Sequence, residues 1–252
     1  MAVRDRREEP SVPISIIRWE KLSEVFSRSH KQGEHVAIVG QTGSGKSVVG
    51  LSLCRIISKR KARDGRPARV VVLGTKPRDD TMTKLVGDWP VVKKWPPSYG
   101  QEHCIVWPRG RTPDQMVARQ RATFRPLLDT IYHEGGQTLY IDEAGHFETP
   151  PPKGLGLETT MEQYWTSARS LSLSLIAGTQ RPRHVSRSMW SEPSWVFIFA
   201  PDDEDDLRRV AELSGAKNSV LNVASALGPH EFVCVHRPRG GRKQLYVSKV
   251  GT

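Results

Sequence analysis

A glycine-rich segment in the first fifth of the chain carries the clearest chemistry. It matches in full the phosphate-binding pattern G-x-x-x-x-G-K-[ST] and reads Gly40-Gln41-Thr42-Gly43-Ser44-Gly45-Lys46-Ser47. Its glycines let backbone N–H groups turn toward the oxygens of a polyphosphate, and Lys46 adds a mobile cation for the β- and γ-phosphates. Ser47 brings a hydroxyl that can ligate Mg²⁺, and Val48 continues into a helix whose positive end faces the phosphates. We therefore predict a site for ATP with Mg²⁺.

The residues on either side predict the elements that must position this loop. An apolar run at residues 35–39 is typical of a buried strand, and the apolar residues within 48–57 favour a helix. A strand that leads through a glycine-rich loop into a helix is the setting in which this pattern binds phosphate. An accidental match in a Gly/Ser-rich turn is the alternative, and the agreement of strand, loop and helix argues against it.

A second motif places two acids at the end of another apolar run. Residues 138–143 read Thr138-Leu139-Tyr140-Ile141-Asp142-Glu143. Downstream of a phosphate loop, such a strand end is expected to hold Mg²⁺ and the attacking water. Asp142 would bind the magnesium shell, directly or through water, and Glu143 would act as the general base. The alternative is a solvated strand end whose acids have no catalytic role.

A third polar strand end follows. The apolar residues at 171–178 predict a strand that runs into Thr179-Gln180-Arg181-Pro182. A glutamine at the end of a central strand beside the acidic one can reach the γ-phosphate or its water. We therefore predict that Gln180 reports the state of the nucleotide.

The remaining segments alternate between strand and helix patterns. We predict further strands at 69–74, 103–107 and 195–199, and helices at 114–134, 160–169 and 202–213. Asp114 is the expected cap of its helix, and Pro126 predicts a kink or boundary there. Residues 145–156 are too rich in proline and glycine for regular structure, whereas 231–236 and 244–250 predict a β-hairpin with a basic tip. The alternation indicates an α/β fold with a largely parallel sheet and helices on both faces.

Length and composition limit the size of the domain that carries this site and the partners that the domain can bind. The chain has 252 residues, enough for one nucleotide-binding domain with short extensions. Lysine and arginine total 38 against 27 acidic residues, and the net charge of +11 favours a polyanionic partner, with a merely basic surface as the alternative. No apolar run reaches the ~20 residues of a spanning helix, and the charged N-terminus does not fit a secretory signal. We therefore expect a soluble, intracellular protein without membrane insertion, in which Cys54, Cys104 and Cys234 are buried free thiols.

Three segments together resemble the FtsK/HerA superfamily of DNA-pumping ATPases: residues 33–47, 139–144 and 169–182. The phosphate loop is shared by many NTPases, whereas Thr-Gln-Arg-Pro at residues 179–182 is more specific. The resemblance extends over roughly residues 33–250. It implies a RecA-like P-loop core of the ASCE type, ATP hydrolysis, a pentameric or hexameric ring and translocation of double-stranded DNA. It also implies that Gln180 is a sensor and that Arg169 is presented to a neighbouring subunit's nucleotide; the alternative is that Arg169 pairs with a local acid such as Glu162.

The chain departs from that family in informative places. Many members carry Asp-Pro-Lys after the second strand, where this chain has Thr75-Lys76-Pro77, which leaves the role of that loop open. Membrane segments and a winged-helix domain are not found, and a nuclease domain does not fit. We predict an N-terminal extension at 1–30 and a motor domain at 31–252, most like a viral genome-packaging ATPase. Its location would be the host cytoplasm or a capsid vertex, with a vertex or portal protein as a possible partner.

Two other functions remain open: a conjugation or DNA-processing motor of the same superfamily, and a slow ATP switch that regulates by binding DNA. For a motor, we expect contacts to the phosphates of DNA without base reading, because positive charge is spread over several loops. The candidates for a pore are Lys93, Lys94 and Lys153. Arg239 and Arg242 in the hairpin form a second set, which would contact DNA or a protein partner.

Overall fold

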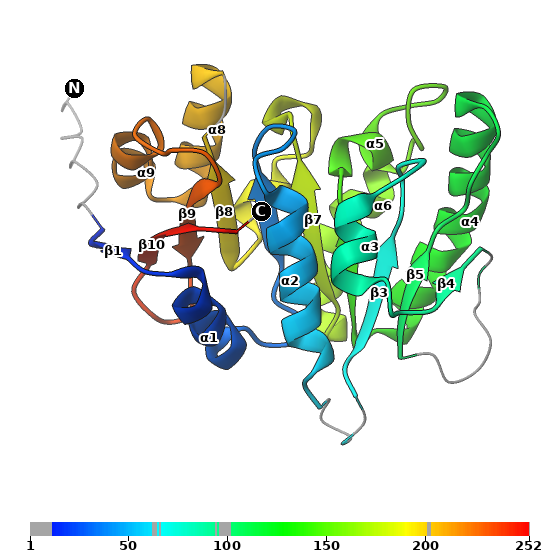
Figure 1. Ribbon diagram of the computed structural model, residues 1–252, viewed down its shortest axis with the longest axis horizontal. Helices are drawn as coiled ribbons and strands as arrows, with labels where there is room; N and C mark the ends of the chain where they lie inside the picture. The colour runs from blue at the N-terminus through cyan, green and yellow to red at the C-terminus, as the bar shows by residue number, and fades with distance from the viewer. Residues whose placement is uncertain are drawn as a thin grey trace, which may run out of the picture.

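The computed structural model describes residues 12–61, 65, 67–93, 95, 102–200 and 203–251. One ten-stranded sheet runs through this part of the chain, with the strand order β1-β10-β9-β8-β2-β7-β6-β3-β5-β4 (Figure 1). The strands are β1 (Ile14–Ile16), β2 (Val36–Val39), β3 (Arg69–Leu73), β4 (Val91–Val92), β5 (His103–Val106), β6 (Gln137–Ile141), β7 (Ser174–Thr179), β8 (Trp195–Phe199), β9 (Glu231–His236) and β10 (Gln244–Lys249). Strand β9 is antiparallel to both of its neighbours, and the other described pairs are parallel.

Helices cover both faces of the sheet. They are α1 (Trp19–Ser29), α2 (Lys46–Ser58), α3 (Asp80–Val86), α4 (Pro113–Glu134), α5 (Ala144–Glu148), α6 (Glu158–Thr166), α7 (Ser188–Ser191), α8 (Glu204–Ser214) and α9 (Lys217–Ala224), with 3-10 turns η1 (Ala168–Leu171) and η2 (Pro182–His184). Buried side chains of α1, α2 and α3 form one core, and those of α4, α5, α6, α8 and α9 form the other. Successive residues of a strand point to opposite faces, so Val36 and Ile38 of β2 join the first core while Ala37 and Val39 join the second.

The parallel strands bring all the predicted motifs to one side. Strands β2, β3, β6 and β7 lie next to one another and point the same way, so the residues that follow them meet at one edge of the sheet. We call this side the carboxyl edge and the opposite side the amino edge. The arrangement confirms the predicted α/β class, the largely parallel sheet and the C-terminal hairpin.

Four local predictions need correction or addition. Helix α4 runs without a break through Pro126, and its cap is Thr112, whose Oγ1 accepts from the Gln115 N–H at 3.3 Å, in place of Asp114. Within residues 145–156, predicted as irregular, the first four belong to helix α5, which Glu143 caps by accepting from the Gly145 N–H. Helices α3, α7 and α9 were not predicted; each is short, at seven, four and eight residues. Strand β7 begins three residues later than predicted, at Ser174.

The predicted N-terminal extension contributes to the sheet where it is described. Strand β1 pairs with β10, and α1 buries Leu22 and Phe26 completely. The Phe26 ring contacts the Trp195 ring of β8 with 5.1 Å between centroids. Residues 1–11 lie outside the described part, and the domain boundary at residue 30 stays a prediction.

The three cysteines are free and buried, as predicted. Among the residues that the structure describes, none of the helices has the length and apolar character needed to cross a membrane.

Candidate nucleotide-binding site

The phosphate loop lies at the carboxyl edge between β2 and α2, and its glycines are required by its geometry. Gly43 and Gly45 have φ values of 79° and 106°, a region that disfavours residues with a Cβ atom. A Cβ on Gly45 would also lie 2.8 Å from Cγ2 of Val250, just after β10. The Ser44 carbonyl lies 3.3 Å from Nδ1 of His230, just before β9. Both ends of the hairpin therefore contact the loop.

Lys46 begins α2 and points back across the loop. Its side-chain nitrogen donates to the Gln41 carbonyl at 2.6 Å, and only 7% of the residue is exposed. Burial lowers the pKa of Lys46, while the carboxylates of Asp142 and Glu143 oppose that shift. A buried ammonium held by the loop backbone is placed to bind an incoming phosphate.

Ser47 and Asp142 meet as the two motifs predict. The Ser47 hydroxyl donates to Asp142 Oδ1 at 2.5 Å, and the Tyr140 hydroxyl donates to the same oxygen at 2.8 Å. Burial opposes ionisation of Asp142, but the Lys76 ammonium and these hydroxyls outweigh it and hold the pKa of Asp142 below its usual value. Gly50 leaves the room that the Tyr140 ring occupies against α2.

These two residues suit Mg²⁺. A hydroxyl oxygen and a carboxylate lie side by side facing the phosphate loop, and Mg²⁺ is commonly held by one or two protein oxygens together with nucleotide phosphates and waters. Within the described ranges there is no group of three or more His, Cys, Asp or Glu residues that could hold a metal by themselves. The donor set therefore fits a metal that arrives with a nucleotide.

Glu143 is held by three donors. The Thr179 hydroxyl donates to Oε1 at 2.7 Å, and the backbone N–H groups of Gln180 and Gly145 donate to its two oxygens at 3.1 and 3.3 Å. Burial raises the pKa of Glu143 in spite of these hydrogen bonds and the nearby Lys46. A fixed carboxylate with a raised pKa has the properties of a general base.

Gln180 contacts the phosphate loop directly. Its Oε1 accepts from the Thr42 hydroxyl at 2.9 Å, while its backbone N–H donates to Glu143. The residue thus bridges the loop and the strand end that carries the acids, and its role as a sensor stays a prediction.

Lys76 is a member of the site that the sequence motifs missed. Its ammonium forms an ion pair with Asp142 Oδ2 and lies 3.5 Å from Asp79 Oδ2. The signal was its place in the loop that follows β3, at the same edge as the other motifs, which predicted that the loop lies near the nucleotide or a subunit boundary; the departure from the family pattern left the role of the loop open.

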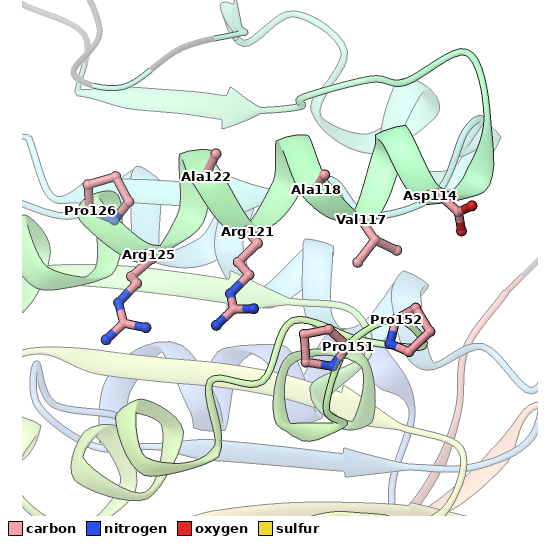
Figure 2. Close-up of a pocket in the computed structure, with 9 residues that line it drawn as sticks. All are labelled: Asp114, Val117, Ala118, Arg121, Ala122, Arg125, Pro126, Pro151 and Pro152. Atoms are coloured by element: carbon pink, nitrogen blue, oxygen red, sulfur yellow. The ribbon is translucent and has the colours of Figure 1, made fainter.

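A cavity of about 640 Å³ joins these groups. Its wall includes Lys46, Lys76, Asp142, Gln180 and His230. A second cavity, of about 590 Å³, lies between α4 and Pro151-Pro152, with Arg121 and Arg125 pointing toward it (Figure 2). None of the predicted site residues lines the second cavity, so the first is the candidate nucleotide site.

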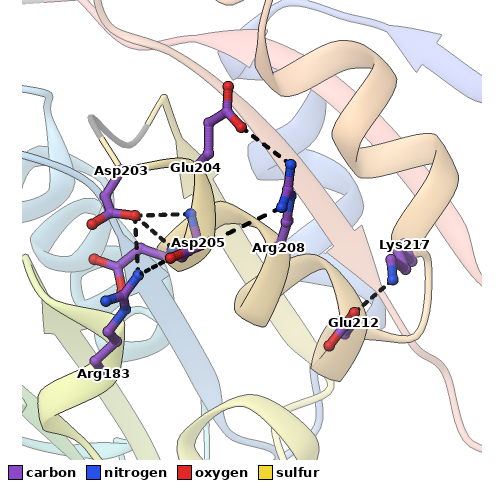
Figure 3. A network of polar contacts seen from close by, with 8 residues as sticks. Arg183, Asp203, Glu204, Asp205, Arg208, Glu212 and Lys217 are labelled. Carbon is purple, nitrogen blue, oxygen red and sulfur yellow. Dashed lines mark hydrogen bonds and ion pairs between the residues drawn. The ribbon is translucent and has the colours of Figure 1, made fainter.

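The segment after Gln180 is tied to α8. Arg183 lies 3.1 Å from Asp203 and 2.9 Å from Asp205 at the start of that helix (Figure 3). It also lies 3.2 Å from Asp206. Asp203 also caps α8 by accepting from two backbone N–H groups. The carboxyl edge thus extends as a network of charged contacts beyond the nucleotide cavity.

Arg169 lies apart from these residues. It belongs to η1, just before β7, and therefore sits at the amino edge. Its guanidinium is 3.9 Å from Glu34, whereas Glu162 accepts instead from the Ser188 hydroxyl at 2.6 Å. Partial burial lowers the pKa of Arg169, and the positive charge of Arg239 lowers it further. The structure does not bring Arg169 to the phosphate loop of its own chain.

The predicted DNA-binding residues fall into separate places. Lys93 is exposed after β4, and Lys153 is exposed in the loop between α5 and α6. Arg239 and Arg242 are exposed in the turn between β9 and β10, at the amino edge near Arg169. Lys94 lies outside the described residues.

No protein-family model and no curated protein matches the chain. Its structure is similar to the genome packaging NTPase B204 from Sulfolobus turreted icosahedral virus 2 in complex with sulfate, with a TM-score of 0.62 and 13% identity over 88% of this chain and 100% of that chain. The match to B204 from Sulfolobus Turreted Icosahedral Virus, a DNA-packaging ATPase, has a TM-score of 0.59 and 14% identity over 86% of this chain and 98% of that chain. The match to the cytoplasmic domain of the Type VII Secretion ATPase EccC from Thermomonospora curvata has a TM-score of 0.52 and 16% identity over 88% of this chain and 26% of that chain. At these identities the similarity is one of fold alone, and the solved structures that share this fold include viral packaging ATPases of the kind that the sequence motifs resemble.

Proposed function

We propose that this chain is an ATPase that moves double-stranded DNA and that it is the genome-packaging motor of a virus. The observation that carries the proposal is that Lys46, Ser47 and Asp142 line one cavity, with Glu143 next to Asp142 and held by Thr179 and Gln180. The likeness in fold to B204, which this chain matches over 98% to 100% of that protein's length, supports the packaging role.

Hydrolysis follows from the roles of the chain's own groups. Lys46 and the backbone of the phosphate loop bind the β- and γ-phosphates. Glu143, oriented by the Thr179 hydroxyl and the Gln180 N–H, takes a proton from the attacking water. When bound at Ser47 and Asp142, Mg²⁺ would supply positive charge against the phosphate oxygens. Gln180 links the γ-phosphate to the segment that Arg183 ties to α8.

In the proposed assembly, a pentameric or hexameric ring encloses the duplex and each Arg169 completes a neighbour's site. Lys93, Lys94 and Lys153, with Arg239 and Arg242, are the candidates to contact DNA phosphates or, for the hairpin pair, a capsid vertex or portal protein. Such contacts would be independent of base sequence.

The test is ATP hydrolysis with and without long duplex DNA, beside sizing of the protein with an ATP analogue. A motor should be strongly stimulated by duplex and should assemble into rings. Hydrolysis that stays slow and indifferent to duplex would favour the ATP switch instead. A conjugation motor would give the same stimulation, so co-assembly with a capsid vertex protein is the measurement that separates it from a packaging motor.

DNA binding gives a second test. Affinity should fall steeply between about 50 and 200 mM salt and vary little among duplex sequences, because phosphate contacts release counterions. Arg239→Ala with Arg242→Ala should reduce the salt slope without changing sequence preference, as measured by fluorescence anisotropy. A salt-insensitive or sequence-selective interaction would contradict the proposed mode of binding.

A further inference from the structure

Lys76 occupies an unusual electrostatic position. Its ammonium pairs with Asp142, a carboxylate that is only 9% exposed and that also accepts from Ser47 and Tyr140. A buried carboxylate without a cation is costly, so Lys76 stabilises Asp142 in the nucleotide-free protein.

Side chains of other elements hold the backbone of the loop at Thr75 and Lys76. The Trp107 indole N–H donates to the Lys76 carbonyl at 2.8 Å, and the Gln120 amide donates to the Thr75 carbonyl at 2.7 Å. Gln120 Oε1 in turn lies 2.8 Å from Nε2 of His146 on α5, the helix that Glu143 caps. The side chain of Lys76 is nevertheless 44% exposed, so its ammonium can move within the cavity while its backbone stays in place.

Mg²⁺ and the Lys76 ammonium would both bind the carboxylate of Asp142. Asp142 with Ser47 is the oxygen pair that suits Mg²⁺, and the Lys76 ammonium already lies on its other oxygen. Like charges that close to one another repel strongly in a partly buried site. Lys76 and Lys46 line the same cavity, so both ammonium groups are available to a phosphate bound in it.

We propose that Lys76 is a second phosphate-binding lysine, which substitutes for the metal at Asp142 in the empty site and turns to the terminal phosphate when Mg²⁺ and ATP are bound. The proposal rests on the proposed ATPase function. It makes Lys76 a residue that distinguishes ATP from ADP, because ADP has no terminal phosphate for it to bind.

The first experiment measures Mg²⁺ binding without nucleotide. Lys76→Met keeps the length of the side chain and removes its charge, which should strengthen Mg²⁺ binding by about tenfold or more, seen as a rise in Tm with added MgCl₂. Adding Asp142→Asn to Lys76→Met should abolish the gain. Lys59→Met, at the far end of α2, is the control for loss of one positive charge and should behave as wild type.

The second experiment compares nucleotides in the presence of Mg²⁺. Lys76→Met should weaken a non-hydrolysable ATP analogue by about tenfold or more and ADP by less than about twofold, measured by calorimetry. If Lys76→Met does not fold, Lys76→Gln, which can still donate a hydrogen bond to Asp142, gives the same contrast.

The outcomes separate the two proposals. Unchanged Mg²⁺ binding, or equal weakening of ATP and ADP, in a wild type that binds ATP would overturn the role of Lys76 and leave the ATPase proposal intact. A wild-type protein that binds neither nucleotide would overturn the ATPase proposal and the role of Lys76 with it.

Discussion

The two edges of the sheet hold their charges in different ways. At the carboxyl edge, Lys46, Asp142 and Glu143 are largely buried. Each is hydrogen-bonded within this chain, to Gln41, Ser47 and Thr179 respectively. At the amino edge, Arg239 and Arg242 are exposed and form no ion pair with the described residues, and Arg169 reaches Glu34 only at 3.9 Å. Buried charges need partners on folding, whereas exposed ones do not. The carboxyl edge is therefore a site organised by the chain itself, whereas the amino edge carries exposed positive charge at Arg239 and Arg242.

The largest expected effect tests whether the amino edge serves a neighbour's nucleotide. Arg169→Ala should slow ATP hydrolysis by about 10³- to 10⁵-fold, the range for an arginine finger, because it removes a guanidinium from charge that develops on the γ-phosphate. Steady-state phosphate release measures the loss. Melting temperature should change little, since the contact of Arg169 with Glu34 is long.

Mixing variants separates a role in trans from a local one. Arg169→Ala and Lys46→Ala, each inactive alone, should recover part of the activity in mixed rings, where an intact Lys46 site can meet an intact Arg169. If the two variants assemble together and stay inactive, or if Arg169→Ala alone is fully active, the two edges do not cooperate in catalysis.

The next effect concerns the carboxyl edge alone. Glu143→Gln should lower turnover by about 10²- to 10⁴-fold and leave ATP binding intact, because the amide keeps the shape of the side chain but cannot accept the proton. Filter binding of labelled ATP beside a hydrolysis assay checks both halves. Turnover at the wild-type rate would remove Glu143 from its role as general base.

The smallest effect tests a buried charge of α5 outside the nucleotide cavity. Glu148 is buried, its Oε2 accepts from the Ser186 N–H at 2.7 Å, and its Oε1 has no partner among the described residues. Burial, reinforced by Glu158 and Glu162, raises the pKa of Glu148 from 4.5 to about 7. The native state therefore holds a proton that the unfolded state loses, and the free energy of unfolding should fall as pH rises from about 4.5 to 7.

Glu148→Gln should remove that decline. We expect the variant to gain about 2 kcal/mol over wild type at pH 8 relative to pH 5, measured by urea unfolding at both values. His30 and His35, whose pKa values burial lowers to about 3 and about 4, act in the opposite direction below pH 6.5. Their contribution is common to both proteins and cancels in the difference. An equal pH dependence in the two proteins would show that Glu148 titrates normally.

The sequence predicted the parts of the fold in which the local hydrophobic pattern matches the burial of each element in the folded protein. Buried parallel strands are continuous apolar runs, so β2, β3, β5, β6 and β8 could be located from hydrophobicity alone. The Ser47–Asp142 contact was predictable because two motifs of known chemistry each end a strand at the same edge.

The remaining features depend on tertiary contacts. Pro126 lies inside α4, whose buried side chains on the same turns, such as Phe124 and Leu128, hold the helix together across the missing N–H. The pairing of Lys76 with Asp142 joins residues 66 positions apart, which follow strands β3 and β6 that become neighbours only in the folded sheet. The position of each residue after a strand predicts the edge of the sheet at which it lies, but local sequence does not predict that the two side chains pair.

The hairpin gives the molecule a mechanical connection between its two edges. Its six-residue strands span about 20 Å, from the exposed turn with Arg239 to residues His230 and Val250 against the phosphate loop. Strand β9 is hydrogen-bonded on both sides, so the ribbon moves as part of a sheet and not as a free arm. A load applied to the turn is therefore carried along the strands to the backbone around Ser44 and Gly45. In this geometry the hairpin is a rigid connection, so a force at the turn and a ligand at the phosphate loop would act on the same piece of chain.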